Sequence, residues 1–417
     1  MTNERDKNEY SKDELIPPTF LNKHFFEDVL RDTENDKDLE ITKFEMIPGT
    51  KPGEHFLSIM FKAVISYTSK GKEISSRPFV VKTLPTEDST KKDMLSTMPV
   101  FDRETEMYTK VLPEMKKIME SIGDHDEIAP RLIYHNTDPD ILIFEDITKL
   151  GYEMNNGFYD FHSTIKVVKK LAKFHALSIY IDDNKYKHKI DLKKYTPMVT
   201  EAVVDRLKVF FEGFDYLKDE VRNWLGFEVI ADKLAVQNET FVNKLLDVYK
   251  HPKAEFKVLC HGDYHVKNMM FIKSGDSIDK IMLLDYQLSF WASPAYDLIY
   301  LLYAFGNSET RKRRAEILLN YHDALTEYLN RLGCLRKPLS LLELNIDMLK
   351  MGTIELLWAV CYLPYYCMDY EKVGTETLVD PTPEAMANMR RIMYRTDTIV
   401  NILKEVLPEF LHKGILD

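Results

Sequence analysis

Cysteine is scarce in this chain of 417 residues, which contains only Cys260, Cys334, Cys361 and Cys367. No two of them form a C-x-x-C pair. Secreted domains held together by disulfides need a much higher cysteine content, so we expect free thiols and a reducing, cytoplasmic environment. The first residues, MTNERDKNEYSKDELIPP, have no apolar run. We therefore expect no secretory signal.

Long hydrophobic runs and excess positive charge are also lacking. The most apolar stretch, residues 356–368, contains Pro364 and is shorter than the roughly 20 residues that a membrane-spanning helix needs. The chain has 56 Lys and Arg against 67 Asp and Glu, a formal net charge of −11. The short apolar runs predict no membrane span. An acidic surface repels polyphosphate backbones, so we also predict no nucleic-acid partner.

Several common enzyme motifs do not occur. The chain has 15 glycines and none of the patterns G-x-x-x-x-G-K-[ST], H-E-x-x-H or G-x-S-x-G. These absences argue against a P-loop NTPase, a zinc protease of the H-E-x-x-H type and an α/β-hydrolase.

What is present is ample material for a folded core. Apolar residues make up 45% of the chain and aromatic residues 12%. Such a composition excludes a disordered or fibrous chain. The length predicts two or three units of domain size.

The pattern of the first 150 residues predicts strands and one long helix. Residues 57–67 alternate apolar and polar side chains, and residues 77–84 form a second apolar run, which together indicate an antiparallel hairpin. An apolar stripe with helical spacing covers residues 101–118. Residues 131–135 and 141–146 predict another pair of strands.

The rest of the chain reads as mainly helical, with one β island at residues 256–284. We therefore predict an α+β fold in which a small N-lobe of antiparallel sheet and helix precedes a larger, mainly helical C-lobe. The predicted organisation is a flexible tail over residues 1–16, the N-lobe over 17–147 and the C-lobe over 148–417.

The β island carries the strongest chemical signal. Asp263 opens a loop after a predicted strand, Asn268 follows five residues later, and Asp285 closes the next hairpin. Phosphoryl transfer from a magnesium nucleotide needs one carboxylate to accept the proton of the attacking hydroxyl. It also needs oxygen ligands, such as an amide and a second carboxylate, for Mg²⁺. This spacing indicates a phosphotransferase.

A second signal comes from the N-lobe. Lys82 ends an apolar strand, and Glu104 lies 22 residues later within an apolar helical stripe. A buried carboxylate needs a cationic partner, and we expect Lys82 to supply it. The alternative is a glutamate at the helix edge that reaches water.

These segments resemble a known family. VLCHGDYHVKNMMF and IMLLDYQLSFWASPAYDLIYLL are similar to motifs of the aminoglycoside phosphotransferase and choline kinase superfamily, and within it to the ecdysteroid-kinase-like family. FDRETEMYTKVLP, ILIFEDI and LAKFHALS fit the same family, so that the likeness spans roughly residues 45–305. The resemblance implies a protein-kinase-like fold and a small-molecule kinase that uses ATP and Mg²⁺.

The resemblance also implies roles for individual residues. Asp263 would be the catalytic base, and Asn268 and Asp285 would be the magnesium ligands. Lys82 would contact the ATP phosphates and Glu104 would position it. The remaining implied positions are Phe144, Glu145 and Ile147 beside adenine, Asp297 as a brace of the catalytic loop, and His261 as a support of that loop or a phosphate contact.

The chain departs from the family pattern in two places. His265 stands where a tryptophan is common, which is either a benign exchange of one ring for another or a change in the acceptor pocket. The expected phosphate loop, residues 48–55, has only two glycines, and Ser58 is a candidate for a hydroxyl contact to phosphate.

The acceptor is expected to be a small molecule with a hydroxyl group. Only residues 286–296 separate Asp285 from Asp297, which leaves little room for a protein-kinase activation segment. The family likeness favours an ecdysteroid or a similar hydroxylated metabolite. A choline, ethanolamine or xenobiotic kinase, or an inactive ligand-binding relative, remains an alternative. No obligate protein partner is implied. The aromatic residues Trp358, Tyr362, Tyr365 and Tyr366, with Trp291, either line an acceptor site or pack the core.

Overall fold

The computed structural model describes residues 16–49, 58–69, 73–84, 98–250, 254–368 and 382–417. The chain divides into two compact units. The first consists of residues 1–113, 129–153 and 282–287, and the second of residues 114–128, 154–281 and 288–417. The predicted tail, residues 1–16, lies outside the described residues except for Ile16. The lobe boundaries stay a prediction.

The first unit is built on a five-stranded antiparallel sheet in the order β1-β2-β3-β5-β4. Its strands are β1 (Glu40–Pro48), β2 (Ile59–Thr68), β3 (Ser75–Thr83), β4 (Leu132–Thr137) and β5 (Asp140–Glu145). The predicted hairpins are thus confirmed as β2–β3 and β4–β5. Alternation along β2 places Phe61, Ala63 and Ile65 in the core, as expected of a strand with one covered face.

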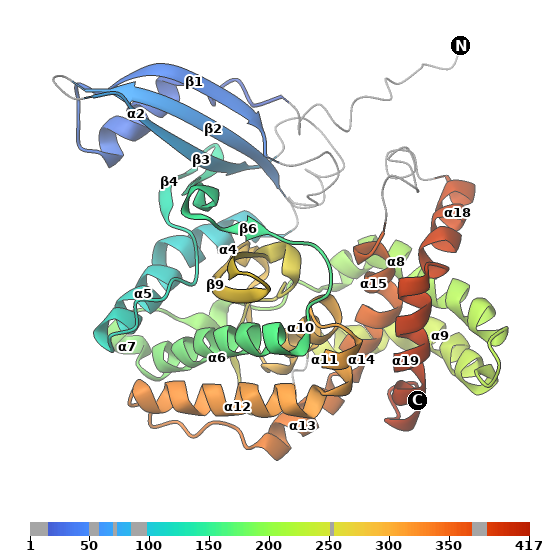
Figure 1. Cartoon of the computed structure of the whole chain (residues 1–417). Coiled ribbons are helices and arrows are strands. Elements are labelled where there is room, and N and C mark those ends of the chain that lie inside the picture. The colour runs from blue at the N-terminus through green and yellow to red at the C-terminus, as the bar shows by residue number, and fades with distance from the viewer. Residues whose placement is uncertain (1–15, 50–57, 70–72, 85–97, 251–253, 369–381) are drawn as a thin grey trace, which may run out of the picture. The chain divides into compact units, whose positions relative to one another are not determined.

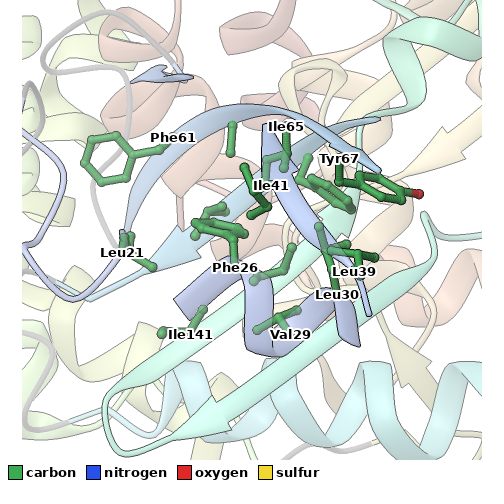
Figure 2. Close-up of a cluster of buried hydrophobic side chains, with 14 of the residues drawn as sticks. Leu21, Phe26, Val29, Leu30, Leu39, Ile41, Phe61, Ile65, Tyr67 and Ile141 are labelled. Atoms are coloured by element: carbon green, nitrogen blue, oxygen red, sulfur yellow. The ribbon is translucent and has the colours of Figure 1, made fainter. Parts of the chain in front are cut away.

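Helix α2 (Lys23–Thr33) covers this sheet on one face (Figure 1). Asn22 caps the helix by accepting a hydrogen bond from the backbone N–H of Phe25. Figure 2 shows Phe26 and Leu30 of the helix among the side chains of Ile41 and Ile65 from the strands. This cluster holds the outer strands of the sheet in place.

A long helix lies between β3 and β4 in the chain and is interrupted once. It begins as α4 (Val100–Glu106), passes through a π-helical turn at Met107–Val111 and continues as α5 (Leu112–Ser121). The predicted apolar stripe is buried, and Glu104 is buried within it. The π turn directly after Glu104 is a feature that apolar periodicity does not reveal.

The second unit is mainly helical. Its helices are α6 (Phe161–Asp183), α7 (Lys185–His188), α8 (Glu201–Arg222), α9 (Glu228–Lys250), α10 (Ala295–Ala304), α11 (Ser308–Lys312), α12 (Arg314–Arg331), α13 (Leu341–Lys350), α14 (Gly352–Leu356), α15 (Leu363–Tyr366), α18 (Pro383–Tyr394) and α19 (Asp397–His412), with a π-helical segment at Leu357–Tyr362. Helices α6 and α12 lie side by side (Figure 1). Among the helices that the structure describes, none combines the length and the apolar character needed to cross a membrane.

Short strands lie between these helices, and the three strands within residues 258–283 confirm the predicted β island. The short strands are β6 (Glu153–Met154), β7 (Val258–Cys260), β8 (Met269–Ser274), β9 (Ser277–Leu283) and β10 (Phe290–Ala292). Strand β10 pairs antiparallel with β7, so that Phe290 faces Cys260. This short ladder anchors the segment that leads into the 261–268 loop. The predicted α+β class, with a small sheet and a larger helical part, is confirmed.

Candidate active site

Strand β3 and helix α4 bring Lys82 and Glu104 together within the first unit. Lys82 lies at the buried end of β3, opposite Leu142 of β5. Its Nζ is 2.6 Å from Oε2 of Glu104, and the two side chains are only 4% and 1% exposed. Glu104 therefore has the cationic partner that burial demands, and does not reach water from the helix edge.

Asp285 joins this pair as a second carboxylate. Lys82 Nζ lies 2.9 Å from Asp285 Oδ1. The Gln287 side chain donates to Asp285 Oδ2 at 3.0 Å, and its Oε1 accepts from Lys82 Nζ at 3.5 Å. The backbone of Asp285 has φ 61°, in the left-handed region that a non-glycine residue adopts at a cost. The side chains of Lys82 and Gln287 thus contact both carboxylate oxygens of Asp285, whose backbone is strained.

The charges of this cluster depend on one another. Burial would lower the pKa of Lys82, but the carboxylates of Asp285 and Glu104 outweigh it and hold that pKa above the usual lysine range, so Lys82 stays cationic. Burial raises the pKa of Glu104 to about 7, against the opposing charge of Lys82. Lys82 lies between the carboxylates of Glu104 and Asp285. If a second cation binds one of these carboxylates, the Lys82 ammonium can contact an anionic ligand.

The 261–268 loop lies in the second unit and follows β7 directly. Asp297, at the start of α10, accepts hydrogen bonds from the backbone N–H groups of His261 at 2.6 Å and Gly262 at 3.0 Å. Gly262 has φ +84°, and a Cβ there would lie 2.1 Å from the carbonyl oxygen of Leu288. The loop therefore requires glycine at this position for both its backbone angle and its close packing.

Two side chains of the same loop contact the Asp263 carboxylate. Asn268 Nδ2 donates to Oδ2 at 2.8 Å and to the Asp263 backbone oxygen at 3.1 Å. His265 Nε2 lies 3.2 Å from Oδ1. Burial raises the pKa of Asp263, but the imidazoles of His265 and His261 and the Asn268 amide outweigh it, so that the net pKa is below the usual range. Asp263 is therefore ionised at neutral pH.

A buried network behind the loop was not predicted from the sequence. His175 of α6 contacts Asp297 Oδ2 through Nε2 at 3.1 Å and the Tyr321 hydroxyl through Nδ1 at 2.7 Å. The side chain of Cys260 donates to the carbonyl oxygen of Ser293. His175, Cys260 and Asp297 have ligand atoms within 4.8 Å of one another, and each of them takes part in one of these hydrogen bonds. The available signal was a histidine inside the apolar stripe of α6, because a fully buried imidazole needs polar partners.

A comparison with protein families shows to which family the chain belongs. The model of the Ecdysteroid kinase-like family matches residues 52–334. The chain belongs to this family. The resemblance drawn from the sequence is thereby confirmed, and with it the kinase-like fold class.

The curated protein and the solved structures compared with this ecdysteroid kinase-like chain differ from it widely in sequence. It is 34% identical over 94 residues to an N-acetylmuramate/N-acetylglucosamine kinase of Caulobacter vibrioides, which covers 22% of this chain and 26% of that protein. The match thus spans only about a quarter of the curated relative. Among solved structures, it is similar to a macrolide 2'-phosphotransferase type I (TM-score 0.43, 13% identity, 92% of this chain and 99% of that one). It is also similar to a Plasmodium vivax ethanolamine kinase (TM-score 0.41, 14% identity, 99% of this chain and 97% of that one). The family assignment rests on the family match.

The remaining predicted site residues of this family member lie in the first unit. Ser58 is buried directly before β2, and Phe144 and Ile147 are buried at and after the end of β5. The backbone N–H of Glu145 donates to the Arg131 carbonyl at 3.1 Å. Residues 50–55, most of the expected phosphate loop (48–55), lie outside the described residues.

The predicted site residues thus form two groups. The structure brings Lys82, Glu104 and Asp285 together in the first unit. It brings Asp263, Asn268 and His265 together in the second, where Asp297 bonds the loop backbone. The sequence analysis predicted Asp285 as a metal ligand but did not predict its contact with Lys82, 203 positions away.

Proposed function

We propose that this chain is an ATP- and Mg²⁺-dependent small-molecule kinase that transfers the γ-phosphate to a hydroxyl group. The observation that carries the proposal is the buried Lys82, held between the carboxylates of Glu104 and Asp285. A buried lysine paired in this way is poised to bind nucleotide phosphates. Membership of the ecdysteroid kinase-like family supports the same activity.

Asp263 is the proposed catalytic base. Its carboxylate is ionised and partly buried, and it is oriented at one oxygen by Asn268 and at the other by His265. In the proposed step the acceptor hydroxyl passes its proton to Asp263 and its oxygen forms a bond to the γ-phosphorus. The bond between that phosphorus and the β–γ bridging oxygen breaks, and ADP leaves with the electron pair.

Asn268 and Asp285 are the proposed ligands of Mg²⁺. Both offer oxygen atoms, the donors that this hard cation prefers. The Asn268 amide uses Nδ2 toward Asp263, which leaves Oδ1 as its ligand atom. When bound, the ion neutralises phosphate charge. When the nucleotide binds, the Lys82 ammonium would move from one of its two carboxylate partners to the phosphates.

The nucleotide contacts are proposals of the same kind. Lys82 contacts the phosphates and Glu104 positions it, with Ser58 as a further hydroxyl donor. Phe144, Glu145 and Ile147 border adenine. His261 and Asp297 support the 261–268 loop, a role supported by the hydrogen bonds from the loop backbone to Asp297.

The proposed acceptor is an ecdysteroid or a similar hydroxylated metabolite, as the family match favours. A choline, ethanolamine or xenobiotic kinase is the second candidate. The four cysteines are free thiols, which supports the proposed cytoplasmic location. The proposal involves no nucleic acid and no obligate protein partner.

Transfer of labelled phosphate from ATP to a panel of ecdysteroids, choline, ethanolamine and aminoglycosides tests this function. We expect a phosphorylated product with one class of acceptor, and no product when Mg²⁺ is chelated. Saturable ATP binding without transfer to any member would favour an inactive relative or an acceptor outside the panel.

A further inference from the structure

A cavity of about 1450 Å³ lies in the second unit, and none of the proposed reaction residues lines it. Its lining residues come from 193–200, 249–250, 254–257 and 336–350, together with Asp182, Trp291 and His322. The structure describes the whole 261–268 loop, and no residue of that loop belongs to the lining. The cavity is large enough for a small molecule, which would not touch the proposed base.

Part of the cavity wall is aromatic and aliphatic. Trp291 of β10 and Tyr249 of α9 line it and are 9% and 8% exposed. Leu339 is buried in the wall, and Ile346 of α13 is 40% exposed. Of the aromatic residues singled out in the sequence, only Trp291 lines this cavity. Side chains of this kind form most of the wall in small-molecule sites, so this part suits the apolar body of a ligand.

The cavity lining carries more positive than negative side chains, although the whole chain has a net charge of −11. Its six cationic residues are Lys193, Lys250, Lys257, Arg336, Lys337 and Lys350, and its four carboxylates are Asp182, Glu255, Glu343 and Asp347. A hollow lined by an excess of one charge concentrates ligands of the opposite charge. The lining therefore favours an anion.

Protein groups already contact two of the four lining carboxylates inside the wall. Arg336 donates to Asp182 Oδ2 at 2.7 Å, and Lys193 Nζ lies 3.1 Å from Asp182 Oδ1. The hydroxyl of Ser293, which follows β10, donates to Asp347 Oδ2 at 2.8 Å. These two carboxylates are therefore engaged within the protein.

The other two lining carboxylates differ from each other. Glu343 belongs to the capping box of α13, where the backbone N–H and the hydroxyl of Ser340 donate to its Oε2 at 2.6 and 2.8 Å. Glu255 is exposed, and its side chain has no ion pair or hydrogen bond among the described residues. Glu255 is thus the lining carboxylate that would oppose a bound anion.

Two lysines of the lining also lack such partners. The side chains of Lys257 and Lys337 form no ion pair and no hydrogen bond with the described residues. Lys257 directly precedes β7 and is partly buried, and Lys337 is exposed in the connection from α12 to α13. A lysine ammonium binds phosphate as a point charge. Both ammonium groups are therefore available to the anionic group of a ligand.

We propose that this cavity binds a small amphipathic anion, an apolar body that carries a phosphate or similar anionic group. Lys257 and Lys337 hold the anionic group, and the wall around Trp291 holds the apolar body. The inference goes beyond the proposed kinase function and does not depend on it. Strand β10 pairs with β7, so a ligand on Trp291 contacts the strand pair that precedes the 261–268 loop.

The test measures the binding of three naphthalene compounds of similar shape by ligand-observed NMR titration. They are naphthyl phosphate, neutral naphthol and the cation naphthylmethylammonium. Mg²⁺ and excess ADP are present throughout, so that the proposed nucleotide site does not take up the phosphate probe. The variants are Lys257→Gln, Lys337→Gln and Glu255→Gln. Lys280→Gln is the matched control, because Lys280 is exposed, has no ion pair among the described residues and does not line the cavity.

We expect the wild type to bind naphthyl phosphate most tightly and naphthylmethylammonium least tightly. Lys257→Gln and Lys337→Gln should each lower the affinity for naphthyl phosphate by about fivefold, the size of one charge contact at about 4 Å in water. Both variants should keep the wild-type affinity for naphthol, which shows that the cavity is intact. Glu255→Gln should raise the affinity for naphthyl phosphate, and Lys280→Gln should match the wild type.

Three results would overturn the inference. The first is an affinity for naphthyl phosphate that is the same in the wild type and in both lysine variants. The second is a wild type that binds naphthol as tightly as naphthyl phosphate, or that binds none of the three compounds. The third is an equal loss of affinity for naphthyl phosphate and naphthol, because the lysines would then contribute no charge contact. Phosphate transfer is not part of the readout, so a failure of the kinase proposal leaves these outcomes unchanged.

Discussion

At the scale of single residues, the electrostatics of the candidate site centre on Lys82. It is one cation for two carboxylates, and both Lys82 and Glu104 are nearly inaccessible to solvent. Removing one member of a buried ion pair leaves the other charge desolvated and unpaired. Lys82 is therefore expected to support stability and nucleotide binding together.

Replacement of Lys82 by methionine tests this dual role. We expect Lys82→Met to lower the free energy of unfolding by about 3 kcal/mol, because Glu104 and Asp285 lose their shared partner. ATP affinity should fall as well. Chemical denaturation and nucleotide titration measure the two effects. Lys62→Met on the neighbouring strand β2 is the matched control, since Lys62 is only partly buried. Equal stability of both variants would contradict the account.

His265 determines how acid the solution can become before the proposed base is protonated. The imidazole opposes the effect of burial and holds the pKa of Asp263 below its usual range. Asp263 should then remain ionised as the pH falls through the ordinary carboxyl range. In His265→Leu burial acts unopposed by that imidazole, so the pKa of Asp263 should rise.

The pH profile of kcat/KM reads this shift directly. We expect the acid limb of His265→Leu to move to higher pH than that of the wild type, with a smaller change on the plateau. An acid limb at the same pH in both proteins would show that His265 does not set the ionisation of the base. It would favour the benign exchange of one ring for another.

At the scale of elements, the 261–268 loop is held from two sides. Asp297 accepts hydrogen bonds from the backbone of His261 and Gly262, and the carbonyl oxygen of Leu288 lies where a Cβ at position 262 would clash with it. The pairing of β7 with β10 joins the segment that precedes His261 to the segment that follows Leu288. The loop geometry is thus determined by the packing of its neighbours as well as by its own sequence.

Gly262→Ala should disrupt this arrangement. The substitution adds a left-handed alanine, at about 1–2 kcal/mol, and a clash with the Leu288 carbonyl, at about 1–3 kcal/mol. Gly275→Ala is the control, because Gly275 has φ +61° but nothing within 4 Å of the added Cβ. Denaturant unfolding should show a loss in Gly262→Ala that clearly exceeds the loss in Gly275→Ala. Similar losses would mean that the contact with Leu288 does not constrain the loop.

Local patterns predicted some elements and missed others for identifiable reasons. Strict alternation over residues 57–67 predicted β2 correctly. Strand β1 was missed because an irregularity in its pairing between Ile41 and Lys43 breaks the alternation. The π-helical segment at Leu357–Tyr362 was missed because it carries the same apolar residues as an ordinary helix.

At the scale of the whole molecule, the same limit applies to contacts between distant segments. Burial logic alone predicted that Glu104 needs a cation, and Lys82 supplies it. The second carboxylate on Lys82 and the pairing of His175 with Asp297 depend on tertiary structure. No local spacing encodes them. Sequence patterns therefore led to the predicted chemistry of the site, but not to the second partners of its charged groups.

At this scale the proposed function draws on residues of both units. Lys82, Glu104 and Asp285 belong to the first unit, and Asp263 and Asn268 belong to the second. We propose that both groups serve one phosphoryl transfer. Family membership supports a single reaction that uses both.

The most direct test is the rate of phosphate transfer from ATP by Asp263→Asn compared with the wild type, on the best acceptor of the panel. The substitution keeps the shape of the side chain but removes the proposed base. We predict that turnover falls by about 10²- to 10⁴-fold while folding and ATP affinity stay nearly unchanged. A variant that binds ATP normally and transfers phosphate at the wild-type rate would contradict the assignment of Asp263 as the base.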